Sequence, residues 1–176
     1  IPTSRGFGRA NEVMISRNLE LSDIFGVKDI KILFGKDKWV NKDIAEQRYS
    51  QLMHYLINNV GVESVIPLKL MKELDKPFLN KKDDRWFQRF YSFLLDHKDL
   101  WSKGERFPLL RQKPIIRTSR NQLVQPFNNI KTGKPNVFLP GESSTYFPTV
   151  KKSILETEDA LEFLSQLGLR EPDKLA

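Results

Sequence analysis

The fold is decided by Asp83-Asp84-Arg85-Trp86-Phe87-Gln88-Arg89-Phe90-Tyr91-Ser92-Phe93-Leu94-Leu95-Asp96, the most aromatic stretch of the chain. Within it, Trp86, Phe90, Phe93 and Leu94 recur at i, i+4, i+7 and i+8, the spacing of one face of an α-helix. The pattern predicts a helix over 83–96, capped by Asp83 or Asp84, with its aromatic face in the core. Aromatic rings can also stack on bases, but this spacing is more typical of a core.

Three more helices are predicted around it. Residues 42–60 start at a plausible N-cap, Asn41, and stop at Gly61. A shorter helix over 67–74 tolerates a proline in its first turn. A last helix over 158–167 follows a threonine cap, carries acidic residues in its first turn and ends at a glycine. The apolar face of the first of these helices comprises Ala45, Tyr49, Leu52, Met53, Leu56 and Val60.

Strands are predicted from short apolar runs bounded by turn residues. Residues 13–15 and 30–34 are two such runs, and Gly35 ends the second. From Phe107 onward the pattern turns to β: 114–125 reads as a hairpin, and 136–139 as a further strand after a polar loop. The fold class predicted is α+β, with four main helices packed on small antiparallel β-hairpins.

The sequence echoes itself. Ile1-Pro2-Thr3-Ser4-Arg5 returns as Ile116-Arg117-Thr118-Ser119-Arg120, 115 positions later. Each copy is followed at a distance by a similar closing phrase, at 19–27 and at 161–169. The echo indicates that the chain contains parts of two related structural units.

The echo also sets the expected domain organisation. We predict that residues 1–40 end a preceding repeat-like unit and that 41–176 form one α+β module. The chain does not begin with Met, and we interpret it as a fragment of a larger protein.

Composition limits the chemistry available. With no Cys, the chain has no disulfide, thiolate metal site or Cys nucleophile, which suits a cytoplasmic location. The two histidines, His54 and His97, are too few for a His-rich metal site. The apolar runs are far shorter than a bilayer requires, so we expect no membrane association.

Charge is distributed unevenly along the chain. Residues 81–120 carry 11 Lys and Arg against 5 Asp and Glu, whereas 153–176 carry 2 against 6. The favoured interpretation is a solvated or internally paired surface; the alternative is contact with a phosphate backbone. The candidate nucleic-acid or partner contacts are Lys81, Lys82, Arg85, Arg89, Arg117 and Arg120.

The motifs of enzyme active sites are missing from the sequence. Gly6-Phe7-Gly8 lacks the third glycine of a dinucleotide-binding loop and is predicted to be a turn. Asp83 and Asp84 are adjacent, so on a helix they diverge by about 100° and make no acid/base pair. We therefore predict no catalytic, cofactor-binding or metal-ligating residue.

Several phrases resemble a known family. The stretches 84–94, 114–118, 137–140 and 163–169, with their W…FY…L, IIRT, VFLP and FLSQLGL patterns, resemble the region after the ATPase domain of large sacsin-like proteins. Those proteins carry an N-terminal ATP-binding module of the GHKL type, shared with heat-shock chaperones. The opening residues 1–6 likewise resemble a phrase that ends the preceding unit of that family.

The resemblance implies a role without catalysis. The family's Mg-ATP phrases, E-x-x-x-N and D-x-G-x-G, do not occur in this sequence. What it implies is an interaction or coupling module whose partners include a neighbouring ATP-binding domain, with no cofactor of its own. The alternative function is a nucleic-acid-binding module that uses the basic stretch 81–120.

Overall fold

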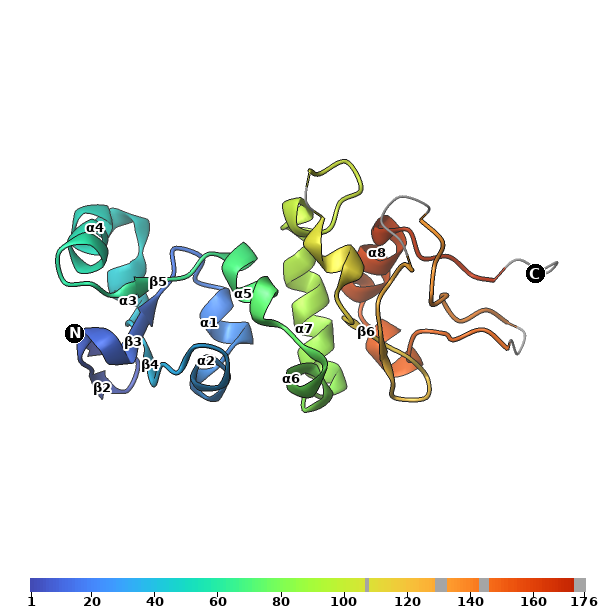
Figure 1. The fold of residues 1–176 in the computed structure, drawn as a ribbon, viewed down its shortest axis with the longest axis horizontal. Coiled ribbons are helices and arrows are strands. Elements are labelled where there is room, and N and C mark those ends of the chain that lie inside the picture. Colours follow the sequence, from blue (N-terminus) through green and yellow to red (C-terminus); the bar gives the residue numbers. More distant parts are fainter. Residues whose placement is uncertain (107, 129–132, 143–145, 173–176) are drawn as a thin grey trace. The chain divides into compact units, whose positions relative to one another are not determined.

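The structure, a computed structural model, describes residues 1–106, 108–128, 133–142 and 146–172. The chain divides into two compact units, Ile1–Glu73 and Leu74–Ala176 (Figure 1). The α+β class predicted from the sequence is confirmed, with antiparallel hairpins in both units.

The first unit is built around a three-stranded parallel sheet of order β4-β3-β5. The central strand, β3 (Val13–Ile15), is entirely buried and pairs with β4 (Lys38–Trp39) and β5 (Glu63–Ser64). Parallel neighbours need crossover connections, and helices supply them. These are α1 (Leu21–Ile24) and α2 (Val27–Phe34) before β4, and α3 (Lys42–Ala45) and α4 (Ser50–Asn58) before β5.

The remaining elements of this unit come before β3 or after β5 in the sequence. A tight antiparallel hairpin joins β1 (Pro2–Thr3) to β2 (Gly6–Phe7), where we had predicted only a turn over residues 6–8. A 3-10 turn over Ala10–Glu12 leads into β3. The helix α5 (Pro67–Glu73) matches the helix predicted over 67–74.

The strand predicted over 30–34 was wrong, because these residues belong to α2. The helix has local start and stop signals: the Asp29 carboxylate accepts from the Gly26 N–H at 3.2 Å, and Gly35 ends it in the left-handed region at φ 69°. Ile30 is buried whereas Ile32 is 59% exposed. A run of five mostly apolar residues does not distinguish a strand from one turn of a half-buried helix.

The helix predicted over 42–60 is interrupted. Asn41 caps α3 as expected, accepting from the Asp43 N–H at 2.9 Å. The chain then passes through a 3-10 turn, Gln47–Tyr49, before α4 begins. The helical part therefore consists of two segments, and the apolar face predicted for one continuous helix is divided between them.

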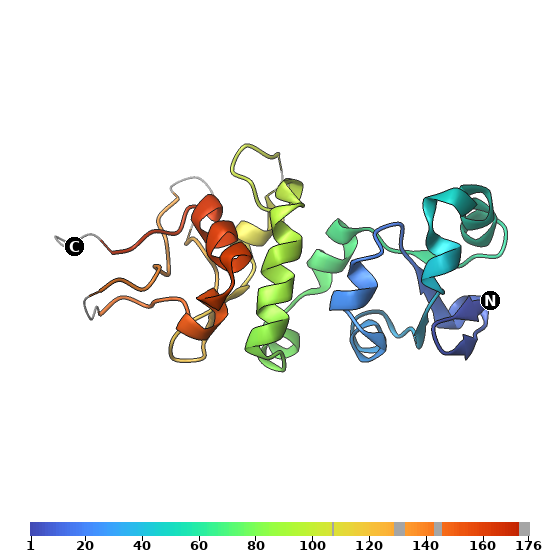
Figure 2. The same cartoon turned by 180° about the vertical axis from the view of Figure 1, so that it is seen from behind.

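The second unit is built around a helix pair, which Figure 2 shows side by side. α7 (Asp84–Leu95) and α8 (Glu158–Leu167) confirm the predicted helices, with Asp83 and Thr157 as their side-chain N-caps. The Tyr91 ring of α7 packs against Phe163 of α8, with 5.0 Å between ring centroids. Because Trp86, Phe90 and Phe93 are also buried, the aromatic face is core.

Shorter elements complete this unit. α6 (Lys76–Asn80) precedes α7, and 3-10 turns span Lys98–Leu100, Leu109–Gln112 and Lys152–Glu156. β6 (Ile116–Arg117) and β7 (Leu123–Val124) form the antiparallel hairpin predicted within 114–125.

The strand predicted over 136–139 is reduced to a single parallel bridge between Phe138 and Thr149. Of the predicted polar loop over 128–135, residues 129–132 lie outside the described residues, as does Phe107, where we expected the β pattern to begin.

The two units repeat one scheme of backbone pairing. Thr3 of the first sequence echo forms an antiparallel bridge with Val40, and Thr118 of the second forms one with Val150. Both threonines are buried in their hairpins. The repeated Ile-x-Thr-Ser-Arg phrase therefore marks the same structural position in both units.

The equivalence extends across the sheet. The N–H groups of the two bridging valines donate to the carbonyls of Met14 at 2.8 Å and Phe138 at 2.9 Å. On the other side of this central segment, β3 pairs with β5, and Leu139 donates to the Arg170 carbonyl at 2.9 Å. The second unit thus reproduces the pairing of the parallel sheet with isolated backbone hydrogen bonds in place of strands.

The same equivalence pairs α4 with α8. Each helix is followed by a glycine in the left-handed region, Gly61 at φ 81° and Gly168 at φ 108°, and then by the third segment of its sheet. The structural counterpart of the phrase 161–169 is therefore 54–62. The phrase 19–27, which we had paired with it from sequence, forms α1 and the start of α2 instead.

The division between units also falls elsewhere than predicted. We expected a boundary after residue 40, but the chain divides between Glu73 and Leu74. The reason is the sheet: β3 pairs with β5, so residues 41–73 complete the unit that residues 1–40 begin.

Candidate functional site

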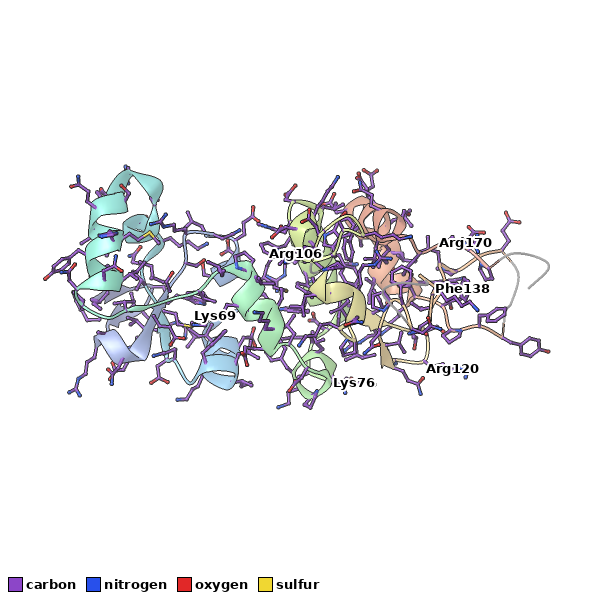
Figure 3. The ribbon with its side chains drawn as sticks, turned by 45° about the horizontal axis from the view of Figure 1, so that its top comes forward. Lys69, Lys76, Arg106, Arg120, Phe138 and Arg170 are labelled. Atoms are coloured by element: carbon purple, nitrogen blue, oxygen red, sulfur yellow. The ribbon has the colours of Figure 1, made fainter. Side chains whose placement is uncertain are left out.

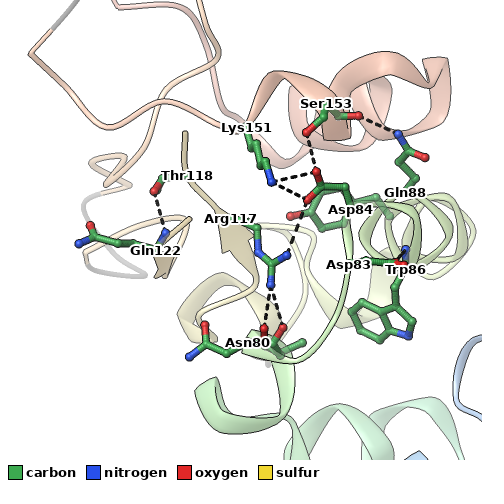
Figure 4. A network of polar contacts seen from close by, with 12 residues as sticks. Asn80, Asp83, Asp84, Trp86, Gln88, Arg117, Thr118, Gln122, Lys151 and Ser153 are labelled. Atoms are coloured by element: carbon green, nitrogen blue, oxygen red, sulfur yellow. Dashed lines mark hydrogen bonds and ion pairs between the residues drawn. The ribbon is translucent and has the colours of Figure 1, made fainter. Parts of the chain in front are cut away.

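Of the candidate basic residues, Arg117 has the most developed environment (Figure 4). Its side chain is 8% exposed. Its guanidinium donates to the carbonyls of Leu79 at 3.1 Å and Asn80 at 3.3 Å, at the end of α6. It also lies 4.7 Å from the Phe87 ring centroid. Arg117 therefore satisfies carbonyls that a helix end leaves unpaired.

Asp84 links this arginine to the segment that leads into α8. It lies 3.6 Å from the Arg117 guanidinium and 2.9 Å from the Lys151 ammonium, and it accepts from the Ser153 hydroxyl at 2.6 Å. Partial burial raises the pKa of Asp84. The hydrogen bonds from Ser153 and Lys151 and the two positive charges outweigh that effect and hold the pKa below its ordinary value.

A second buried arginine, Arg111, has a similar role that sequence reasoning missed. It donates to the Leu167 carbonyl at the end of α8 at 2.8 Å, and its guanidinium lies 4.0 Å from the Phe127 ring centroid. Burial lowers the pKa of Arg111. The only sequence signal was its place in an apolar run, Leu109-Leu110-Arg111.

The other candidates do not join Arg117. Lys82 lies over the rings of Phe78 at 4.6 Å and Trp86 at 5.4 Å, and is half-buried. Exposed candidates occupy three separate places: Lys81 directly follows α6, and Arg85 and Arg89 lie one turn apart on α7. Arg120, which Figure 3 labels, lies in the β6–β7 turn. The six residues therefore form no single site.

A cleft of about 440 Å³ opens in the first unit, where β4 ends and α3 begins. Arg5, Asp23 and Lys42 are among its lining residues, and the Lys42 ammonium is paired with the Asp23 carboxylate. The pairing compensates much of the positive charge, and the lining offers no nucleophile with an adjacent base. We assign this cleft no chemistry.

The surface of α4 is the more unusual feature. Tyr49, Leu52 and Tyr55 are 43%, 42% and 55% exposed, whereas Met53 and Leu56 of the same helix are buried. We had predicted Tyr49 and Leu52 on the apolar face of one helix with Met53 and Leu56, and the structure leaves both partly exposed. Three large exposed apolar side chains within seven residues are typical of an interaction surface.

The described residues contain no group of three or more His, Cys, Asp or Glu side chains that could hold a metal ion. Across the same residues, none of the helices combines the length and apolar character needed to cross a bilayer.

Comparisons of the chain with protein-family models, curated proteins and solved structures found no match.

Proposed function

We propose that this chain is a non-catalytic interaction and coupling module of a larger, cytoplasmic, chaperone-like ATPase protein. The observation that carries the proposal is the repeated scheme of hairpin, sheet and helix in the two units. Repeat architectures stack similar units and present extended surfaces to partners. The exposed apolar side chains of α4 provide such a surface.

The polar network of the second unit supports the coupling part of the proposal. Arg117 on β6 holds the end of α6, and Asp84 at the start of α7 holds Lys151 and Ser153. These bonds join the β6–β7 hairpin to α6 and α7, and join α7 to the segment that leads into α8. A displacement of the hairpin by a neighbouring domain would therefore be passed to the helix pair.

Nucleic-acid binding is the second candidate. Lys81, Arg85 and Arg89 are exposed on α6 and α7, which favours it. Arg117, however, is buried in contacts within its own unit. The exposed candidates lie on separate elements and form no single basic site, so we rank this function second.

The coupling function is tested by calorimetry of this chain with the neighbouring ATP-binding domain of the longer protein. We expect affinity to differ between the nucleotide-free and the ATP-bound domain, because coupling requires different affinities for two states. The chain alone with Mg-ATP is the control and should give no heat of binding and no turnover. Equal affinity in both states, or ATP turnover by the chain alone, would overturn the proposal.

A further inference from the structure

The two equivalent units differ in how well their cores are covered. In the first unit four apolar residues of the central cluster are only half-buried, whereas their counterparts in the second unit are at most 1% exposed. The counterparts follow from the shared hairpin, the bridging valines and the left-handed glycines that follow α4 and α8. The pairs are Ile1 and Ile116, Ile44 and Ile154, Ile57 and Leu164, and Val60 and Leu167.

The cover in the second unit comes from the segment that precedes its hairpin. Tyr91 of α7 and Trp101 after it pack on Phe163 of α8, at 5.0 and 5.2 Å between ring centroids. The Tyr91 hydroxyl donates to the Ile115 carbonyl at 2.7 Å, directly before β6. Arg111 reaches the end of α8, as described above. Tyr91, Trp101 and Arg111 thus cover α8 and the start of the hairpin together.

One exposed side chain of α4 stands where α8 contacts α7. In the second unit the Ser92 hydroxyl of α7 donates to Asp159 of α8. Counting back from Gly61 and Gly168, the left-handed glycines that follow the two helices, Leu52 stands at the position of Asp159 and Tyr55 at that of Glu162. Asp159 and Glu162 are themselves exposed beside α7, so these two positions lie at the edge of the helix contact. At this edge α4 presents two apolar side chains, both more than 40% exposed, where α8 presents carboxylates.

We infer that the α4 face of the first unit binds an aromatic, amphipathic helix of the α7 type. The order within the second unit, helix before hairpin, would place this helix N-terminal to Ile1 in a longer protein. The inference rests on the proposed function and names the partner that the module takes on this face.

The binding face also dictates how this helix must differ from α7. Asp84 has three partners in the second unit, Arg117, Lys151 and Ser153. Their counterparts in the first unit are Pro2, Asn41 and Asp43. An acidic residue at the Asp84 position would therefore meet a carboxylate and no cation. The partner helix carries a neutral or basic residue there, because like charges at that spacing repel.

A peptide of residues 81–98 carrying Asp84→Lys is the probe, labelled with fluorescein and titrated with the 176-residue chain by fluorescence anisotropy. We expect saturable binding, at least about tenfold tighter than that of a scrambled peptide of the same composition. The unsubstituted peptide should bind more weakly than the probe, and Asp43→Lys in the chain should reverse that order.

Two variants of the chain locate the binding site. Leu52→Asp with Tyr55→Asp should weaken probe binding by at least about tenfold, since they place two charges in an apolar contact. Leu161→Asp on α8, which changes a residue of similar exposure, 45%, is the matched control and should leave binding unchanged. All these side chains are exposed, so the variants should keep the melting temperature of the parent.

Binding no tighter than that of the scrambled peptide would overturn the inference. Binding that survives the α4 substitutions, or that Leu161→Asp abolishes, would overturn it as well. Neither result bears on whether the chain recognises the nucleotide state of an ATP-binding domain, so the inference and the proposed function fail separately.

Discussion

Replacing Arg117 with Ala tests whether this arginine belongs to the protein's structure or to a binding site. The change removes both hydrogen bonds to the end of α6, at 3.1 and 3.3 Å, together with the stacking on Phe87. A buried polar group left unpaired costs about 1–3 kcal/mol, and loss of one partner of a buried ion pair costs about 3–5 kcal/mol. Asp84 keeps two partners and is 26% exposed, so losing its ion pair with Arg117 costs less than that range.

We therefore expect the free energy of unfolding of the second unit to fall by about 3–4 kcal/mol. Urea unfolding followed by tryptophan fluorescence measures the change, because Trp86 and Trp101 are buried in this unit. Arg120→Ala, in the exposed turn of the same hairpin, is the control and should change stability by less than about 0.5 kcal/mol. A loss of under about 1 kcal/mol for Arg117→Ala would refute the reasoning.

Three further predictions concern the core, the pH dependence and the basic surface. Trp86→Ala should lower the free energy of unfolding by about 3–5 kcal/mol, as measured by urea titration, since the ring is buried and stacked on its neighbours; a folded variant with unchanged melting would contradict the core assignment. Because the folded-state pKa of Asp84 lies below its ordinary value, its contribution to stability is complete above about pH 4 and is lost as pH falls through the folded pKa. Asp84→Asn should therefore lower stability at pH 7 and flatten its decline in acid, whereas parallel stability curves would count against the ion pairs. Replacing Lys82, Arg85 and Arg89 with Gln should matter little for DNA in filter-binding assays, since we expect weak affinity at about 150 mM salt; submicromolar binding that these changes abolish, with a flatter salt dependence, would favour nucleic acid.

The parts of the fold that sequence predicted are those with strong local signals. The helix over 83–96 has a 3.6-residue aromatic period and an Asp cap, and 158–167 has a Thr cap and a terminating Gly. These features are set by residues within one or two turns of each other, so they can be read without knowledge of the fold. The hairpin within 114–125 also has a short-range signal, a polar turn between two apolar runs.

The parallel sheet could not be predicted in the same way. Its strands are two or three residues long, too short for a period to appear, and β3 pairs with β5 across about 50 residues. The strand wrongly expected over 30–34 has the same cause, because a short apolar run fits either a strand or a half-buried helix.

Prediction of the candidate site from sequence was limited by a different factor. Charge along the sequence identified Arg117 as a candidate contact, but its burial depends on α6, α7 and a phenylalanine ring that only the fold brings together. Arg111 was missed for the same reason. The apolar spacing of Tyr49 and Leu52 predicted that they share one helix face with Met53 and Leu56. Whether each residue of such a face is covered depends on the elements packed against it, which the periodicity of one helix does not reveal.

Hydrogen exchange of the longer protein, compared with and without Mg-ATP, tests the central claim most directly. If this chain couples to a nucleotide-driven neighbour, amide protection should change on ATP binding along α4 (Ser50–Asn58), which carries exposed apolar side chains, and in the β1–β2 hairpin, where Phe7 is 76% exposed. Matching exchange in these elements in both nucleotide states, while the ATP-binding domain itself responds, would contradict the account.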